Sequence, residues 1–374
     1  MYNCNLKMYK FANLIKKLNS IMNQFKKLNN IAGWLVFLIA SFVYFSTIEQ
    51  TVSFWDCGEY IATAYKLEVG HPPGAPLFQL FGRIFTLFAA QGTSEVAVAI
   101  NIMSALCSSF TILFLFWTIT AFGKKMFFKD ENNIEFGRII AVLGSGIVGA
   151  LAYTFSDSFW FSAVEGEVYA MSSLFTAATF WCIMKWEQEA DKPHASRWLV
   201  LIGYLIGLSV GVHLLSLLTI PAMGMIYYFK KYEYTKAGAV KAFVSSMIIL
   251  GLVQGVIIPG AVSLISKFEL FFVNTIGLPF NSGTIIYFLA IIGAITFGLI
   301  YTKKHNKAVW NTAILGMMML LIGYSSFAIL VVRSNANPPI DENNPEDAVG
   351  LLSYLKREQY GSWPIVYGQH FNAK

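Results

Sequence analysis

Nine long apolar segments constrain the fold of this chain more than any other feature of its sequence. A helix needs about 20 mostly apolar residues to cross a bilayer, and a window of about 19 residues finds these segments. Inside a bilayer every backbone polar group must be satisfied within the protein, so the segments are expected to be helical. The sequence therefore predicts an all-α integral membrane protein with about nine transmembrane helices. The segments are residues 31–48, 96–122, 138–155, 168–185, 198–213, 215–229, 242–265, 283–301 and 308–332, of which the fifth and sixth are short and nearly continuous.

The charged residues are unevenly divided between the two ends of these segments. With a cytoplasmic N-terminus, 20 of the 27 Lys and Arg residues fall on the inner side, and 14 of the 21 Asp and Glu residues fall on the outer side. Cytoplasmic loops carry an excess of Lys and Arg, so this predicts an N-in, C-out protein of the cell inner (cytoplasmic) membrane. The formal net charge of +6 is then an orientation signal, and no nucleic-acid partner is predicted.

Three regions follow from this topology. Residues 1–30 are predicted to form a basic cytoplasmic N-terminus. Residues 31–333 form the transmembrane domain, with an external loop at 49–95, and residues 334–374 begin an extracytoplasmic segment. The first apolar segment leads into Glu49 without a small-x-small cleavage site, which indicates an uncleaved signal anchor.

Cysteine and histidine spacing predicts neither a disulfide framework nor a metal site. Of the four cysteines, only Cys57 falls on the outer side. There is no Cys-x-x-Cys or His-x-x-x-His pair, so no cofactor is predicted, although the outer carboxylates leave a divalent cation open.

The external loop is predicted to contain two short helices that lie in the membrane interface. Ser53 can cap a first helix with Asp56 at its third position, and Gly70 with the following prolines ends it. Pro76 suits the first position of a second helix, whose polar residues recur at helical spacing among large apolar ones.

Two interpretations of the polar residues in this loop are open. The residues concerned are Asp56, Glu59, Glu68 and His71. In the first interpretation the aspartate caps a helix, the glutamates are solvated and the histidine belongs to a turn. In the second, Phe54, Trp55 and Tyr60 partly desolvate the carboxylates near the membrane, which favours base chemistry.

Four sequence blocks resemble a known family. They are "WDCGEYIATAYKLEVGHPPGAP" at 55–76, "FSDSFWFSAVEGEVYAMSSLF" at 155–175, "GLSVGVHLLSLLTIPA" at 207–222 and "RSNANPPIDENNPEDAVGLLSYLKREQYG" at 333–361. The chain resembles a bacterial membrane family labelled as a domain of unknown function. The eukaryotic relative of that family is the transmembrane-protein-260 type of protein O-mannosyltransferase. Family members are usually much longer, so we expect this chain to be a truncated product or a fragment.

The resemblance implies a GT-C-like glycosyltransferase, an enzyme that uses sugars carried on polyprenyl phosphate. It implies transfer of a mannose-like sugar to Ser or Thr of an exported protein. GT-C enzymes place an essential acid in the first external loop, which falls here on Asp56. A single general base that activates the acceptor hydroxyl would give inversion at the anomeric carbon.

The phosphate leaving group needs a cation or a hydrogen-bond donor. Arg333 lies at the predicted outer end of the last span, where a lipid phosphate would sit, and guanidinium binds phosphate bidentately. Arg83 has a similar claim. The alternatives are an arginine that anchors a helix and one that snorkels to the interface.

The resemblance also points to further site residues. Glu59 is a candidate to bind a sugar hydroxyl or orient the acceptor, and His71 to donate to the phosphate or polarise the acceptor. Glu165 and Glu167 lie in the second external loop, where on a helix they would diverge so that at most one faces the site. His213, between the short fifth and sixth spans, is either a structural hydrogen-bonding residue or a ligand.

The tail after Arg333 is predicted to contain one helix. Asn344 can cap it, and Val349, Leu352 and Leu355 share one side. Two interpretations are open: the tail packs over the mouth of the active site, or it links to a missing domain.

Two other functional classes compete with a glycosyltransferase. A transporter or lipid flippase would bury acids or bases near the bilayer midplane. Here the spans 96–122, 242–265, 283–301 and 308–332 contain no Asp, Glu, Lys or Arg. A scaffold of an envelope complex is the third class, and it gives no reason for the acidic loop.

Overall fold

The structure is a computed structural model that describes residues 2–89, 93–128, 135–361 and 368. These residues are almost entirely helical or in turns between helices, as an all-α membrane protein requires. The chain divides into two compact units. Unit 1 comprises Met1–Gly58 and Phe85–Ile202, and unit 2 comprises Glu59–Ile84 and Gly203–Lys374. The last residues of the predicted tail region, 362–367 and 369–374, lie outside the described residues.

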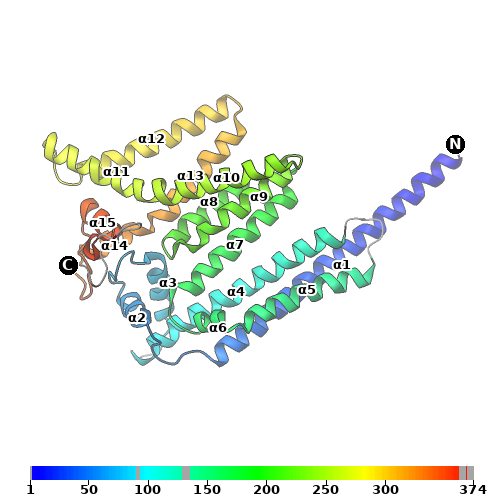
Figure 1. The fold of residues 1–374 in the computed structure, drawn as a ribbon, viewed down its shortest axis with the longest axis horizontal. Coiled ribbons are helices and arrows are strands. Elements are labelled where there is room, and N and C mark those ends of the chain that lie inside the picture. Colours follow the sequence, from blue (N-terminus) through cyan, green and yellow to red (C-terminus); the bar gives the residue numbers. More distant parts are fainter. Residues whose placement is uncertain (1, 90–92, 129–134, 362–367, 369–374) are drawn as a thin grey trace. The chain divides into compact units, whose positions relative to one another are not determined.

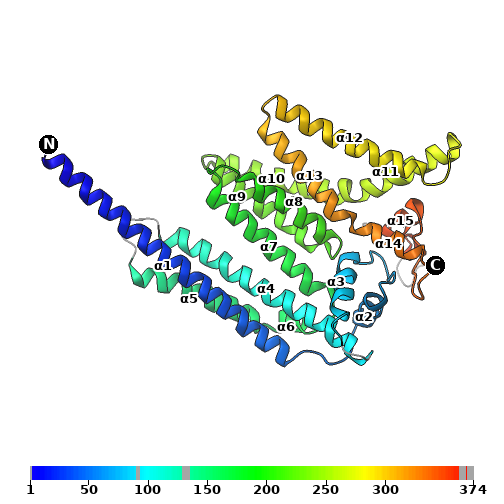
Figure 2. The same cartoon turned by 180° about the vertical axis from the view of Figure 1, so that it is seen from behind.

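Unit 1 is a bundle of long helices. Helices α1 (Tyr2–Ser46), α4 (Ser94–Phe127) and α5 (Phe136–Thr154) run side by side in Figures 1 and 2, and α7 (Val168–Glu189) packs on α4. The short helix α6 (Asp157–Ala163) packs against the start of α7. The core of this unit includes Tyr44, Ile112 and Phe116, each of them fully buried. Helix α1 runs through the predicted N-terminal region 1–30 and into the first predicted span, so the two regions form one continuous helix.

Unit 2 contains two short helices of the predicted external loop and most of the C-terminal half. Helices α2 (Cys57–Lys66) and α3 (Pro76–Thr86) come first, and α8 (Ser196–Val210) leads through a 3₁₀ turn to α9 (Thr219–Lys231). Helices α10 (Lys236–Leu252), α11 (Ile258–Leu270), α12 (Ser282–Lys304), α13 (Ala308–Tyr324), α14 (Ala328–Ser334) and α15 (Ala348–Leu355) complete the unit. Three helices, α2, α3 and α8, cross a boundary between the units along the chain.

Proline explains one irregularity of unit 2. Helices α10 and α11 are joined by a π-helical turn at Val253–Ile257, directly before Pro259. Proline has no N–H and its ring collides with the carbonyl four residues earlier, so a regular α-helix cannot pass through this position. The widened turn lets one long apolar segment continue.

Glycine allows α8 and α13 to touch backbone to backbone. A Cβ atom on Gly207 would lie 2.1 Å from the carbonyl oxygen of Leu320, and one on Gly203 would lie 2.5 Å from that of Gly316. On the other helix, a Cβ on Gly323 would lie 2.4 Å from the backbone nitrogen of Leu208. Small residues at such spacing are the usual means by which membrane helices approach closely.

Within the part of the chain that the structure describes, six helical segments are long and apolar enough to cross a membrane: Ile21–Ser46, Glu95–Phe127, Phe136–Thr154, Lys236–Thr275, Ser282–Lys304 and Ala308–Ser334. They match six of the nine predicted spans. The other three, at 168–185, 198–213 and 215–229, are the helices α7, α8 and α9, which do not meet the same measure of length and hydropathy. The multi-pass class is thus confirmed, and the number nine stays a prediction.

Candidate active site

Asp56 lies in the turn directly before α2, so its predicted place at the third position of a helix is wrong. Trp55 has a left-handed backbone with φ of 60°, and the helix starts only at Cys57. The chain leading to this turn is fixed to α4, because the Asn101 side chain donates to the carbonyls of Glu49 at 2.7 Å and Thr51 at 3.2 Å. Helix α2 ends at Lys66, before the predicted stop at Gly70.

Asp56 is exposed, which corrects the expectation that neighbouring aromatics desolvate it. Phe54 and Trp55 are 79% and 89% exposed, and Asp56 between them and α2 is exposed as well. Only Tyr60 of the three predicted aromatic neighbours is buried.

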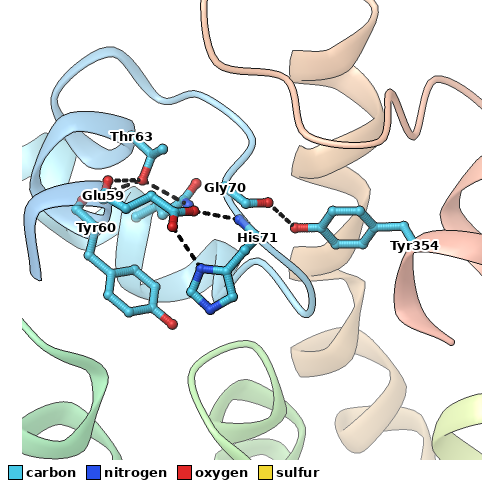
Figure 3. Close-up of polar contacts among 7 residues, drawn as sticks. Glu59, Tyr60, Thr63, Gly70, His71 and Tyr354 are labelled. Carbon is cyan, nitrogen blue, oxygen red and sulfur yellow. Dashed lines mark hydrogen bonds and ion pairs between the residues drawn. The ribbon is translucent and has the colours of Figure 1, made fainter. Parts of the chain in front are cut away.

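Glu59 and His71 are joined by two contacts in unit 2 (Figure 3). One carboxylate oxygen of Glu59 accepts the backbone N–H of His71 at 2.5 Å, and the other lies 2.9 Å from His71 Nδ1. The His71 ring also packs against Tyr60, with ring centroids 5.6 Å apart. Burial alone would raise the pKa of Glu59, but the hydrogen bonds and charge of His71 outweigh it and lower that pKa.

The turn that presents His71 depends on two glycines. A Cβ on Gly70 would lie 2.5 Å from the carboxylate oxygen of Glu59, so any side chain there would displace the acid from His71. Gly74 has φ of +84°, which favours glycine, and a Cβ there would meet the hydroxyl of Tyr354. The turn between the two loop helices is therefore closely packed at both glycines.

The tail after Arg333 folds back onto this turn. Tyr354 of α15 is fully buried and donates its hydroxyl proton to the Gly70 carbonyl at 2.5 Å (Figure 3). Val69 exchanges two backbone hydrogen bonds with the tail, through Ile340 and Glu342. The tail is thus part of the support of the His71 turn.

The predicted helix in the tail is displaced by several residues. It begins at Ala348, capped by the Asp347 side chain rather than by Asn344. Its buried side therefore carries Ala348, Leu351 and Tyr354 instead of the predicted stripe at 349, 352 and 355.

Glu342 is a site residue that the sequence did not single out. Burial and the nearby Glu59 carboxylate raise the pKa of Glu342, while His71 partly offsets them. The carboxyl group therefore lies within electrostatic reach of the Glu59–His71 pair. Only its place in the acidic tail pointed to it, and nothing there indicated which of the tail acids returns to the turn.

Arg83 and Arg333 both bond to the C-terminal end of α2. Arg83 Nη1 donates to the Tyr65 carbonyl at 2.6 Å. Arg333 Nε donates to the Leu67 carbonyl at 2.5 Å, and its Nη2 to the Lys66 carbonyl at 3.3 Å. The last carbonyls of a helix have no partner within the helix and carry partial negative charge, so two guanidinium groups stabilise them well.

Helix α3 turns its polar side inward. Gln79 is 1% exposed and its Nε2 donates to the Thr63 hydroxyl at 3.2 Å, whereas Phe81 and Ile84 are 41% and 43% exposed. Leu77 and Phe78 are buried as well, at 5% and 0% exposure, so apolar side chains of α3 face both into the protein and outward.

Glu68 is buried, which corrects the interpretation that it is solvated. It is 3% exposed, and its Oε1 has no hydrogen-bond partner among the described residues. A buried carboxyl oxygen without a partner is costly, so Glu68 joins the functional candidates of unit 2.

Glu165 and Glu167 lie close to Cys57 in unit 1. They occupy the bend between α6 and α7, not a helix, so the expectation that they diverge is wrong. Both are buried, at 5% and 6% exposure. Glu167 caps α7 by accepting the Val168 N–H at 2.9 Å.

Burial raises the pKa of the Cys57 thiol, and the charges of Glu165, Glu167 and Asp56 raise it further. Three predicted site residues therefore lie around one thiol.

Burial raises the pKa of Glu165, and hydrogen bonds from Ser53 and Cys57 only partly offset it. The charged form is therefore less stable in the folded than in the unfolded protein. Below the ordinary Glu pKa of about 4.3 both states are protonated and no cost arises. As pH rises through the window between that value and the raised one, the folded state loses stability.

We therefore expect Glu165→Gln to raise Tm at pH 8, with a gain that shrinks as pH falls toward 4. Glutamine keeps an oxygen acceptor without the charge. For a unit of this size Tm changes by about 2–4 °C for each kcal/mol recovered. Thermal unfolding of the purified chain in detergent across this pH range measures the effect.

Glu189→Gln is the control, and its expected change in Tm has the opposite sign. The Trp198 indole and Arg197 hold the pKa of Glu189 below its usual value, so its replacement is expected to lower Tm at neutral pH. A Glu165→Gln variant with the native Tm at every pH would contradict a destabilising carboxylate.

His213 lies between α8 and α9 as predicted. Its Nδ1 accepts the Leu215 N–H at 3.2 Å and so caps the following 3₁₀ turn. Burial lowers the pKa of His213, which favours the neutral ring. This geometry is that of a structural hydrogen-bonding residue, and a role as ligand stays a prediction.

The structure thus assembles two groups of predicted site residues. Glu59, His71, Arg83 and Arg333 surround the end of α2 and the following turn in unit 2. Asp56, Glu165 and Glu167 surround Cys57 in unit 1. Within the described part of the chain, no three His, Cys, Asp or Glu side chains are placed to hold one metal ion.

Comparison with known proteins shows which family the middle of the chain is similar to. Residues 56–236 match the model of the protein O-mannosyl-transferase TMEM260 N-terminal domain, and this range includes every predicted site residue except Arg333. The chain is thus a multi-pass membrane protein whose residues 56–236 are similar to the N-terminal domain of the TMEM260 proteins. No solved structure matches the chain significantly.

Two curated relatives define the extent of this similarity. The chain is 32% identical over 143 residues to protein O-mannosyl-transferase tmem260 of Dictyostelium discoideum, which covers 38% of this chain and 15% of that protein. It is 26% identical over 176 residues to protein O-mannosyl-transferase TMEM260 of Mus musculus, which covers 47% of this chain and 22% of that protein. The chain therefore spans less than a quarter of the length of either relative.

Proposed function

We propose that this chain is a GT-C-like membrane glycosyltransferase that moves mannose from a polyprenyl-phosphate carrier to Ser or Thr of exported proteins. The observation that carries this proposal is the family match over residues 56–236, which starts at Asp56 and contains the Glu59–His71 pair. The two relatives are named as protein O-mannosyl-transferases. The proposed location is the cytoplasmic membrane, with the N-terminus inside and the site on the outer face.

In the proposed reaction the acceptor hydroxyl oxygen attacks C1 of the sugar as the C1–O bond to phosphate breaks. Asp56 takes the hydroxyl proton, and the polyprenyl phosphate leaves with the bonding electron pair. One displacement inverts the anomeric carbon. An exposed carboxylate at the start of α2 is accessible to an acceptor peptide, which supports this role for Asp56.

His71 is the proposed donor to the leaving phosphate, and Glu59 is its positioning residue. Glu59 bonds both the backbone N–H and Nδ1 of His71, which fixes the orientation of the ring. Nε2 is then the nitrogen proposed to meet the phosphate. Glu165, Glu167 and His213 are proposed to contact substrate from other segments of the family match.

Arg83 and Arg333 are proposed to help bind the phosphate from the end of α2. Their bonds to the carbonyls of residues 65–67 hold each guanidinium in place and leave the positive charge near the turn that carries His71. A fixed cation stabilises developing charge without reorganisation.

An apolar cavity of about 600 Å³ in unit 2 supports a lipid-linked donor. Helices α11, α12, α13, α14 and α15 line it, with side chains that include Ile265, Ile291, Leu321, Val331 and Leu351. It reaches Val332, the neighbour of Arg333. An isoprenoid chain in this cavity would leave its phosphate near the arginine.

The test is transfer of radiolabelled mannose from polyprenyl-phosphate mannose to a Ser/Thr peptide. Membranes that contain the full chain are expected to label the peptide, and matched membranes without it are not. Polyprenyl-phosphate glucose as donor tests the sugar. Labelled lipid that crosses a vesicle membrane with no labelled peptide would favour the transporter instead.

A further inference from the structure

Asn101 is a buried amide inside an apolar helix that is long enough to span the membrane. It lies about two turns after the start of α4, and it is 1% exposed. Its Nδ2 donates to the carbonyls of Glu49 at 2.7 Å and Thr51 at 3.2 Å. Its Oδ1 is buried and has no hydrogen-bond partner among the described residues. Polar side chains are costly to bury in a membrane span, so this residue needs a reason to be there.

The stability of the fold gives only a weak reason for this amide. Its two hydrogen bonds stabilise the folded chain, but a buried oxygen without a partner costs at least as much as one such bond contributes. The net contribution of Asn101 to stability is therefore small. What the side chain does specify is the place of the two carbonyls to which it donates.

These two carbonyls belong to a tight turn that other contacts of unit 1 also fix. The Glu49 N–H donates to the Val164 carbonyl at 3.1 Å. The Glu49 carboxylate accepts the Thr51 N–H at 3.0 Å and the Thr51 hydroxyl at 2.9 Å. This turn brings both carbonyls to one amide nitrogen, so Asn101 binds the turn as a whole.

The turn leads directly to Asp56. Ser53 and Cys57, on either side of Asp56, both hydrogen-bond the Glu165 carboxylate. Trp55 has a left-handed backbone, which a tryptophan rarely adopts unless its surroundings hold it. The segment that carries the exposed Asp56 is thus held from α4 and from the bend that contains Glu165.

We propose that Asn101 is a positioning residue for Asp56, an inference that rests on the proposed function of Asp56 as general base. An exposed carboxylate on a loose segment would occupy many positions, and few of them lie within hydrogen-bond reach of an acceptor hydroxyl. Helix α4 packs against α1, α5 and α7. A double hydrogen bond from the interior of this helix therefore fixes the path of the segment that presents the base.

The first test measures kcat and KM for mannose transfer by membranes that contain the full chain. Asn101→Ala is expected to lower kcat about 10- to 100-fold, because small displacements of a reacting group have effects of this size. The KM for the donor should stay near its native value, since Asn101 does not contact the donor in this role. Asn101→Gln keeps the amide donor and should recover part of the loss.

Asn311→Ala is the matched control. Asn311 of α13 also donates two hydrogen bonds through Nδ2, to the Leu299 carbonyl at 3.2 Å and the Thr302 hydroxyl at 2.9 Å. Its replacement removes the same number of bonds without touching a candidate site residue, so kcat should stay near the native value. An equal loss of kcat in both variants, or a loss confined to KM, would overturn the proposal.

A second measurement does not depend on catalysis. Hydrogen–deuterium exchange of the segment 47–57 in the purified full chain should be about tenfold faster in Asn101→Ala and unchanged in Asn311→Ala. Unchanged exchange in Asn101→Ala would overturn the proposal. A native chain that transfers no mannose would reject the proposed function, and this exchange would still decide whether Asn101 orders the segment.

Thr51→Val replaces the first variant if Asn101→Ala fails to fold. Thr51 is exposed, and valine removes only the hydroxyl bond to Glu49 within the turn. We expect kcat to fall about threefold, in proportion to one hydrogen bond. A native kcat in Thr51→Val would then count against the positioning role of this turn.

Discussion

Asp56→Asn is expected to reduce mannose transfer by about 100- to 10,000-fold, the usual contribution of a general base. Asparagine keeps the size and the hydrogen-bonding oxygen of the side chain but cannot accept the hydroxyl proton. Because Asp56 is exposed and precedes α2, the change should leave the fold intact. Transfer to a Ser/Thr peptide in membranes at matched expression measures the effect.

Asp157→Asn is the matched control for this variant. Asp157 is an exposed acid of unit 1 at the start of α6, and no role in the reaction is proposed for it. Its transfer rate should stay near the native value. If Asp56→Asn transfers mannose as fast as Asp157→Asn does, Asp56 is not the base.

Gly207→Ala is expected to lower the stability of unit 2 by about 1–3 kcal/mol or more, as overpacking of a closely packed interior does. The added Cβ would lie 2.1 Å from the Leu320 carbonyl oxygen, and a backbone atom inside a helix cannot move aside as a flexible side chain can. Helices α8 and α13 would have to separate. Thermal unfolding in detergent should show a clearly lower Tm.

Gly293→Ala provides the comparison for this loss. Gly293 lies inside α12, and a Cβ there would have nothing within 4 Å. Inside a helix alanine is more favourable than glycine by about 1 kcal/mol, so the Tm of Gly293→Ala should equal or exceed that of the native chain. Equal Tm values for the two variants would contradict a close contact between α8 and α13.

Hydropathy was sufficient to predict most of the helices. The long apolar segments at 96–122, 138–155 and 283–301 correspond to α4, α5 and α12 within a few residues, because length and apolar content dominate there. Pro76 correctly marked the start of α3, because proline fits the first helical position at no cost.

The environment of individual polar side chains was not predictable in the same way. Asp56 is exposed and Glu68 is buried, the reverse of what their sequence neighbours suggested, because burial depends on contacts distant in the chain. The cap at Asp347 rather than Asn344 moved the buried stripe of α15 by one residue. The small-residue spacing of Gly203 and Gly207 was a usable signal for the α8–α13 contact.

The hydrogen bond from Tyr354 to Gly70 has a consequence for the order in which this protein is made. The two residues are 284 positions apart, so the ribosome completes the loop long before it makes its partner. The turn that presents His71 lacks the backbone pairing of Val69 until residue 342 has been made, and this hydrogen bond until residue 354 has been made. A chain interrupted before the tail would insert its helices into the membrane and yet leave the turn without its final support.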